Sequence, residues 1–295
     1  MALWKRRNPV VADNRTSTGG DAPPSLEELG LAHLTFDQRV GLRDEVLAGF
    51  YLNDSGELVS GFPITGSDIL VDVGCGSGGP LEFCARHAGH VHAIDVDQRV
   101  IDHARAQMTG RGIDLSNVTF HVGSGAGLPL PDGSATRVIC LEVLEHVDDP
   151  SEVMAELVRV AAPGALLLVS VPDSRGEEFL RHYAPAAAWE PPHHIRTFDR
   201  GQLRKVVLDA GLEILDSGTT GFFRAIWLGL YWSQDQKVGD ESHEAIPIWA
   251  TDDNDILHEW TDVWNSILDR PNGQRLKLAL DGLLPKSQYL VTRKP

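Results

Sequence analysis

The feature that most constrains the fold of this chain is an alternation of short apolar runs and helical stretches between residues 68 and 172. Apolar runs of this length are typical of buried strands, and the stretches between them are long enough for a crossover helix. Repeated β-α-β units build a mainly parallel sheet with right-handed crossovers. We therefore predict an α/β, Rossmann-like doubly wound fold with a mainly parallel sheet.

Apolar periodicity also gives the expected elements. Strands are predicted at residues 69–73, 91–95, 118–122, 137–141 and 165–171, and helices at 80–88, 98–109 and 151–160. A further helix is predicted at 199–210, followed by a strand at 212–215. Residues 287–292 are predicted to form an antiparallel closing strand.

The chain divides into a core and three additions. Residues 1–24 show no apolar period and are predicted to be a flexible tail. Residues 25–66 are predicted to be an N-terminal helical cap. Residues 67–221 and 286–295 are expected to form the α/β core. Residues 222–285, rich in tryptophan and acidic side chains, are predicted to be a helical, aromatic-rich insert.

Two helices are expected in the N-terminal cap. Ser25 followed by Glu28 matches a capping box for the first. Apolar residues at near-helical spacing predict a second helix that ends near residue 53; they are Phe36, Val40, Leu47 and Phe50.

The formal net charge of −16 argues against one class of partner. A nucleic-acid binder needs basic surface to displace counterions from phosphates, so we expect no nucleic-acid partner. No run of about 18 apolar residues predicts a membrane span, and the basic N-terminus lacks the apolar region of a secretory signal. The cysteines lack CxxC spacing and fit reduced thiols. We therefore expect a cytoplasmic protein with no membrane partner.

A glycine-rich loop, Gly74-Cys75-Gly76-Ser77-Gly78-Gly79, joins the first core strand to its helix. It satisfies the G-x-G-x-x-G pattern of dinucleotide-binding sites. Its glycines allow a tight turn and let a ligand approach the backbone closely. Sites for nicotinamide dinucleotides and for S-adenosylmethionine share these needs, so the loop alone leaves both cofactors open.

Two carboxylates flank this loop. Asp72 lies two residues before it, where an acidic group suits the ammonium end of a methionine moiety and would sit poorly beside a pyrophosphate. Asp95 ends the next strand, about 20 residues beyond the loop, where a carboxylate can accept hydrogen bonds from both ribose hydroxyls. The first feature favours S-adenosylmethionine, whereas the second fits either cofactor.

Four segments together resemble class I S-adenosylmethionine-dependent methyltransferases, and above all the type 11 branch that includes ubiquinone-biosynthesis O-methyltransferases. They are Ile69–Gly78, Ala93–Asp97, Leu141–Pro150 and Leu157–Pro172. The same branch is also resembled by the run His194-Ile195-Arg196-Thr197-Phe198. The resemblance covers residues 66–216 and does not extend to the tail or to the insert. It implies methyl transfer from S-adenosylmethionine, with S-adenosylhomocysteine as the product.

The resemblance also implies the cofactor contacts. Asp72, Gly74 and Gly76 would lie along the methionine and ribose, Asp95 would hold the ribose hydroxyls, and Val96 would flank the adenine. Further contacts are expected from Cys75, Ser124, Gly125 and Glu142.

Ser124 departs from the family pattern. The family usually has Gly-Asp-Ala before a Leu-Pro pair, and its Asp contacts the adenine amino group. Here the stretch is Gly123-Ser124-Gly125-Ala126. Either the hydroxyl of Ser124 makes this contact, or the contact is lost and cofactor binding weakens by about 1 kcal/mol.

Methyl transfer to a hydroxyl requires a base that removes the proton. Candidates should lie at the carboxyl ends of the strands, facing the crevice. His146 follows the fourth strand, and His193 and His194 follow the fifth across a loop that resembles a lid. We predict His194 and His146 as catalytic residues, because His194 begins the family-like H-x-R-x-F run. Alternatively, His146 only braces its loop, and Pro191 and Pro192 make the histidine pair a structural turn.

Glu142, Glu145, His146 and His194 resemble an E-x-x-E-H…H arrangement that holds a divalent cation in some relatives. Many type 11 relatives carry the same letters without a metal. We therefore assign no metal site.

The sequence thus predicts an S-adenosylmethionine-dependent methyltransferase acting on a small-molecule acceptor, with O-methylation favoured over N-methylation. The alternatives are an NAD-dependent oxidoreductase and a non-catalytic S-adenosylmethionine-binding module. Aromatic side chains of the insert either line an acceptor pocket, pack the insert against the core, or form a homodimer interface; they are Phe222, Phe223, Trp227, Tyr231 and Trp232.

Overall fold

The computed structural model describes residues 35–191, 193–234 and 255–295, and it is built around one sheet of seven strands in the order β6-β5-β4-β7-β8-β10-β9. The strands are β4 (Ile69–Val73), β5 (His90–Asp95), β6 (Val118–Val122), β7 (Ala135–Leu141), β8 (Ala161–Pro172), β9 (Glu213–Thr220) and β10 (Ser287–Arg293). Neighbours from β6 to β8 pair in parallel, and β10 pairs antiparallel with both β8 and β9. The predicted Rossmann-like sheet with an antiparallel closing strand is confirmed.

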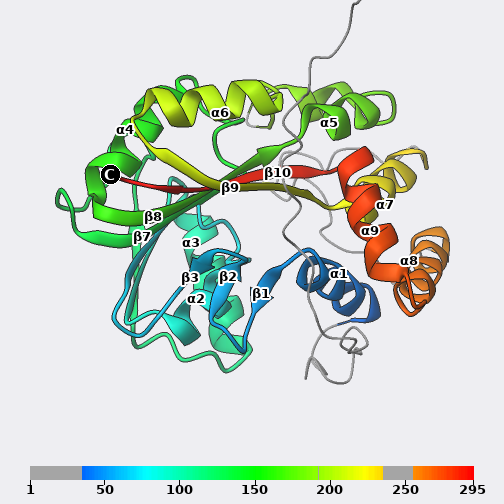
Figure 1. Ribbon diagram of the computed structural model, residues 1–295, viewed down its shortest axis with the longest axis horizontal. Helices are drawn as coiled ribbons and strands as arrows, with labels where there is room; N and C mark the ends of the chain where they lie inside the picture. Colours follow the sequence, from blue (N-terminus) through cyan, green and yellow to red (C-terminus); the bar gives the residue numbers. More distant parts are fainter. Residues whose placement is uncertain (1–34, 192, 235–254) are drawn as a thin grey trace, which may run out of the picture.

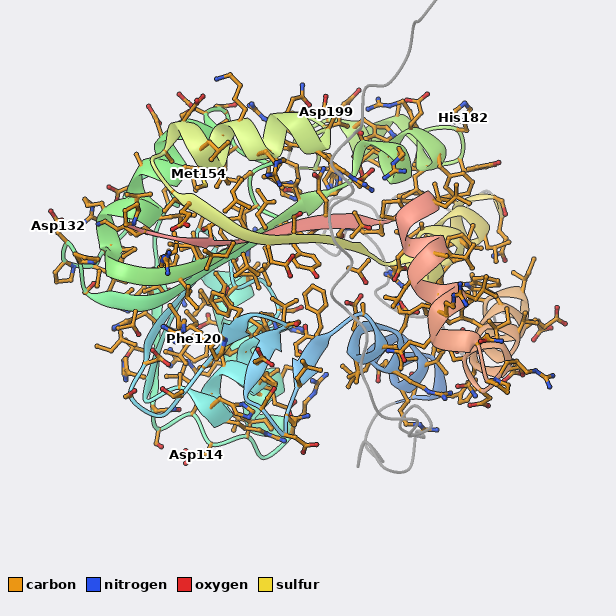
Figure 2. All side chains as sticks on the ribbon, in the orientation of Figure 1. Asp114, Phe120, Asp132, Met154, His182 and Asp199 are labelled. Carbon is orange, nitrogen blue, oxygen red and sulfur yellow. The ribbon has the colours of Figure 1, made fainter. Side chains whose placement is uncertain are left out.

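Helices cover both faces of this sheet, as Figure 1 shows. On one face lie α4 (Pro150–Val160), α5 (Ser174–Leu180) and α6 (Arg200–Asp209), and on the other α2 (Leu81–His87) and α3 (Gln98–Gly110). Figure 2 shows Met154 of α4 and Phe120 of β6 on opposite sides of the sheet. Met154 is fully buried in one hydrophobic cluster, whereas Phe120 packs against a second.

Aspartate caps begin four of these helices. The side chains of Asp97, Asp149, Asp173 and Asp199 accept backbone N–H groups of the first turns of α3, α4, α5 and α6. Each such cap typically stabilises a helix by about 1 kcal/mol. Because these caps follow strands or loops at one edge of the sheet, they also fix where the chain turns back.

The strand order reverses between β4 and β7, with β5 and β6 on one side and β8 on the other. In open α/β sheets, ligands bind at such a switch point, in the crevice outside the carboxyl ends of the strands. The loops that follow β4, β5, β7 and β8 therefore meet at the edge where a ligand site is expected.

The N-terminal region differs in part from the expected helical cap. α1 (Phe36–Leu47) begins with a capping box formed by Thr35 and Gln38, but it ends before Phe50. Gly49 follows with φ at 94°, a left-handed conformation that commonly terminates helices. The prediction that this helix extends to about residue 53 is therefore wrong.

Three short strands occupy the end of this region instead. They are β1 (Phe50–Leu52), β2 (Glu57–Val59) and β3 (Phe62–Pro63), joined in an antiparallel sheet. The predicted tail at residues 1–24 and the predicted helix near Ser25 lie outside the described residues.

The insert between β9 and β10 is helical where the structure describes it. α7 (Phe222–Trp232), α8 (Asp255–Leu268) and α9 (Gly273–Leu283) gather with α1 beyond one end of the sheet (Figure 1). Phe223, Trp227 and Trp232 are buried in the hydrophobic cluster that these helices share, and Phe222 and Tyr231 pack against it. These contacts support packing as the role of the aromatic side chains. The domain boundaries drawn from the sequence remain a proposal.

Buried ionic contacts also bind α1 to the insert. The ammonium of Lys277 is fully buried, lies 3.2 Å from Oδ2 of Asp44 and pairs with Asp281 on its own helix. Trp264 donates from Nε1 to Oδ1 of Asp44 at 2.8 Å. A helix that precedes the core in sequence is thus part of the same packing unit as the insert.

Candidate active site

The glycine loop after β4 is shaped by two left-handed residues, Gly74 and Gly76, with φ at 73° and 50°. A Cβ on Gly74 would lie 2.3 Å from Cγ2 of Val143, so the close approach of the loop after β7 requires glycine here. A Cβ on Gly76 would meet no protein atom closer than 4.0 Å. The loop is therefore closed on one side by Val143 and accessible at Gly76.

Asp95, at the end of β5, is bound to this loop. Its Oδ2 accepts the N–H of Gly76 at 3.0 Å, and its Oδ1 accepts the N–H of Asp97 at 3.1 Å. A carboxylate oxygen can accept two hydrogen bonds, so each oxygen retains capacity for a ligand hydroxyl. Val96, the next residue, is 73% exposed and offers an apolar surface to a planar base.

Asp72 is buried in β4, with 1% of its surface exposed. Burial, together with the charge of Asp95, raises the pKa of Asp72 to about 7. Its Oδ2 accepts no hydrogen bond from the described residues. Because an orphaned buried carboxylate is costly, a cationic or hydrogen-bonding ligand group would relieve it.

Three other predicted contacts lie nearby. Cys75 is buried, and burial raises the pKa of its thiol. Ser124 lies exposed in the loop after β6, where its Oγ accepts the N–H of Ala126 at 3.2 Å. A Cβ on Gly125 would lie 3.3 Å from Cγ1 of Val153, so this part of the loop packs tightly on α4. The contacts of all three with a cofactor remain predictions.

Glu142 begins the loop after β7 with φ at 56°, an uncommon conformation for a residue with a side chain. Its Oε1 accepts a hydrogen bond from Oγ of Ser170 at 3.1 Å, and its Oε2 pairs with the ammonium of Lys286. Burial lowers the pKa of Lys286, but Glu142 and two neighbouring carboxylates together raise it above its usual value. Glu142 is thus already paired with Lys286, and its contact with the cofactor remains a prediction.

The structure brings His146 and His194 together from the loops after β7 and β8. Their ring centroids are 5.0 Å apart, and the ring planes are nearly perpendicular, at 75°. Nδ1 of His194 lies 3.0 Å from Oε2 of Glu177, and Nε2 of His146 lies 3.8 Å from Oε1 of Glu145. Each histidine is thus backed by a carboxylate, while 34% of the His146 side chain and 24% of the His194 side chain remain exposed.

The backbone N–H of His193 donates to the carbonyl of Glu190 at 2.8 Å. The region interpreted as a lid also contains α5 and a 3₁₀ helix, η1 (Ala186–Trp189). Pro192, part of the alternative structural turn, lies outside the described residues.

Glu145 is 1% exposed, and neither carboxylate oxygen accepts a hydrogen bond from the described part of the chain. Burial, and next the charge of Glu142, raises the pKa of Glu145 well above its usual range. Single ligand atoms of Glu145, His146 and His194 lie within 4.8 Å of one another. This donor set has the chemistry to hold a divalent metal ion.

Two charged residues of this region were not predicted from the sequence. Glu177 is separated from His194 by 17 positions, and Lys286 from Glu142 by 144. No motif or periodicity links positions so far apart. Only the approach of α5 and of the start of β10 to the edge of the sheet reveals them.

Comparison with known proteins shows which proteins this chain resembles. Residues 71–169 match the family model described as a methyltransferase domain. A "probable S-adenosylmethionine-dependent methyltransferase" of Mycolicibacterium smegmatis is 31% identical, over 55% of this chain and 58% of the relative. Norajmaline N-methyltransferase of Rauvolfia serpentina is 28% identical, over 61% and 57%. A ubiquinone biosynthesis O-methyltransferase of Hahella chejuensis is 36% identical, over 38% and 46%.

The chain thus spans little more than half the length of the first curated relatives it matches. A candidate methyltransferase of Bacillus halodurans C-125, known from its crystal structure, has a TM-score of 0.52 and 20% identity. That alignment covers 79% of this chain and 94% of the other. At this identity it shows the fold alone.

Proposed function

Because the chain carries a class I S-adenosylmethionine-dependent methyltransferase domain of the type 11 family, we propose that it transfers a methyl group from S-adenosylmethionine to a small-molecule acceptor. This family uses S-adenosylmethionine, forms S-adenosylhomocysteine and does not require a metal. The main support for the proposal is the hydrogen bond from the backbone N–H of Gly76 to Oδ2 of Asp95, at the accessible part of the glycine loop. It joins a hydroxyl-binding carboxylate to a backbone that a ligand can approach.

The residues at this edge fit S-adenosylmethionine. The unpartnered Oδ2 of Asp72 supplies a buried hydrogen-bond acceptor for the ammonium end of the methionine moiety, and that cation would favour the charged carboxylate. Asp95 retains hydrogen-bonding capacity for both ribose hydroxyls, and Val96 presents an apolar surface for the adenine. Ser124 is exposed in the neighbouring loop and can offer a hydroxyl to the adenine amino group.

The proposed chemistry is an in-line displacement for which the protein supplies alignment and a base. When bound, S-adenosylmethionine supplies a sulfonium methyl group, which is already a reactive electrophile. His194 is the proposed base, and His146 flanks it at the same strand ends. Both side chains are part exposed, which an acceptor hydroxyl would need in order to reach them.

We propose oxygen over nitrogen as the methylated atom, because a hydroxyl must lose its proton during transfer and two imidazoles lie at the site. An uncharged amine can attack without such a base. N-methylation remains the alternative, since the relatives include an N-methyltransferase as well as an O-methyltransferase.

The net charge of −16 supports a small molecule, in preference to a nucleic acid, as the acceptor. No helix within the described ranges has the length and apolarity to cross a membrane. We also propose a cytoplasmic location, which the free thiols of Cys75, Cys84 and Cys140 support. A homodimer is part of the same proposal.

The test is to incubate the purified protein with methyl-labelled S-adenosylmethionine and panels of phenols, sugars and amines. Acceptor-dependent formation of S-adenosylhomocysteine, with the label on an acceptor oxygen, supports the proposal. Label on nitrogen contradicts the oxygen preference. Binding without turnover in any panel would point to the non-catalytic module, which the serine at position 124 favours.

A further inference from the structure

Glu177 is a buried carboxylate in contact with the proposed base. It lies in the first turn of α5, with 4% of its side chain exposed, and its Oε2 is 3.0 Å from Nδ1 of His194. This distance is that of a normal hydrogen bond. A buried carboxylate that accepts a hydrogen bond from one imidazole nitrogen favours the tautomer with the proton on that nitrogen.

The position of Glu177 is fixed by the packing of α5 on the chain that enters β10. A Cβ on Gly176 would lie 2.2 Å from the carbonyl oxygen of Pro285, so the helix backbone rests directly on this segment. The N–H of Asp173, the cap of α5, donates to the carbonyl of Lys286 at 3.0 Å. Two backbone contacts with Pro285 and Lys286 therefore fix the helical turn that carries Glu177.

The ring of His194 is confined as well. The rings of His146 and Trp189 lie edge-on to it, with centroids at 5.0 and 6.0 Å and interplanar angles of 75° and 74°. The N–H of Ile195 donates to the carbonyl of Glu145 at 3.1 Å, which ties this segment to the loop after β7. These contacts restrict rotation of the imidazole but do not choose its tautomer.

We propose that Glu177 is a positioning residue that holds the His194 proton on Nδ1 and leaves the lone pair of Nε2 for the acceptor; this rests on the proposed function. An imidazole that donates from Nδ1 accepts at Nε2. The acceptor O–H gives its proton to Nε2 while its oxygen bonds to the methyl carbon and the carbon–sulfur bond breaks. The positive charge thus moves from sulfur to the imidazole, beside the carboxylate of Glu177, which stabilises it.

The first test reads the tautomer directly and needs no acceptor. Nitrogen-15 NMR of histidine-labelled protein, with His194 assigned by its loss in His194→Ala, should show a protonated Nδ1 and an unprotonated Nε2. Glu177→Met removes the hydrogen-bond acceptor at similar side-chain length and should abolish this preference. Glu178→Met, at the exposed neighbouring position, should leave it unchanged. A protonated Nε2 in the wild-type protein, or an unchanged tautomer in Glu177→Met, would overturn the proposal.

The second test separates positioning from cofactor binding. With an acceptor found in the panels, Glu177→Met should lower kcat about 10- to 100-fold, part of the roughly 100- to 10,000-fold contribution of a general base, while the Kd for S-adenosylmethionine stays within about twofold. An unchanged kcat overturns the role of Glu177. Failure of the wild-type protein to bind S-adenosylmethionine overturns the proposed function instead, and the tautomer measurement still decides whether Glu177 controls His194.

Discussion

The backbone N–H of Gly76 donates a hydrogen bond to Oδ2 of Asp95 at 3.0 Å, joining the glycine loop after β4 to the end of β5. Asp95 also accepts the N–H of Asp97, which caps α3. One carboxylate therefore organises the backbone on both sides of the proposed ribose position. Loop shape and hydroxyl binding depend on the same side chain, so substitutions here should affect both.

Gly74→Ala should destabilise the protein and weaken S-adenosylmethionine binding. The new Cβ would lie 2.3 Å from Cγ2 of Val143, and φ at 73° is strained for alanine. We expect a loss of roughly 1 to 3 kcal/mol in the free energy of unfolding, measured by urea denaturation. Gly79→Ala is the control, because its Cβ would meet no atom within 4 Å. Equal stability of the two variants would contradict the close approach of the two loops.

Asp72 should make the free energy of unfolding fall as pH rises from about 4 to about 7. Its pKa in the folded chain, about 7, lies above the ordinary aspartate pKa of 3.8, so between these values the folded chain holds a proton that the unfolded chain has lost. This stabilisation is complete below about pH 4 and is lost as pH rises through about 7. Asp72→Asn should match the wild type below about pH 4 and exceed its free energy of unfolding by a growing margin as pH rises to about 7. The exposed Asp54→Asn serves as the control, and a difference that is constant with pH would rule out the buried titration.

Lys277→Met should unfold at a markedly lower urea concentration. The ammonium is fully buried between Asp44 and Asp281, and its removal leaves two buried carboxylates without their cation. Breaking a buried ion pair in this way typically costs about 3 to 5 kcal/mol. Arg275→Met, at an exposed position of the same helix, should change stability little. If both variants are equally stable, the contact between α1 and the insert does not support the fold.

His194→Ala should lower kcat about 100-fold or more, the usual contribution of a general base, without weakening S-adenosylmethionine binding. His146→Ala should have a smaller effect, because its contact with Glu145, at 3.8 Å, is longer than the contact of His194 with Glu177, at 3.0 Å. His182→Ala, exposed at the end of α5 (Figure 2), is the control. A larger loss of kcat in His146→Ala than in His194→Ala would make His146 the base.

The parallel core could be predicted because each buried strand is a continuous apolar run, as in the stretch before Gly74 and in residues 165–171. The expected strands at 69–73 and 118–122 match β4 and β6 at both ends. The three short strands β1 to β3 could not be predicted, because two or three residues show no period. Phe50 continued the apolar spacing of α1, and only the left-handed φ of Gly49 separates it from that helix.

The candidate site could be predicted in part, for a different reason. Asp72, Asp95 and His146 follow strands directly, so their place at one edge of the sheet follows from the fold class. Glu177 and Lys286 come from segments whose approach depends on the packing of α5 against the start of β10. Such contacts are decided by tertiary structure and leave no local pattern.

Calorimetric titration of the purified protein with S-adenosylmethionine and, separately, with NAD⁺ shows which of the two cofactors the glycine loop binds. We predict binding of S-adenosylmethionine alone, weakened at least about tenfold by Asp95→Ala, because charge-assisted hydrogen bonds to the ribose would be lost. Thermal unfolding of Asp95→Ala is the control, because it shows whether losing the hydrogen bond from the Gly76 N–H destabilises the fold itself. Binding of NAD⁺ in place of S-adenosylmethionine, or of neither compound, would rule out the proposed methyltransferase function.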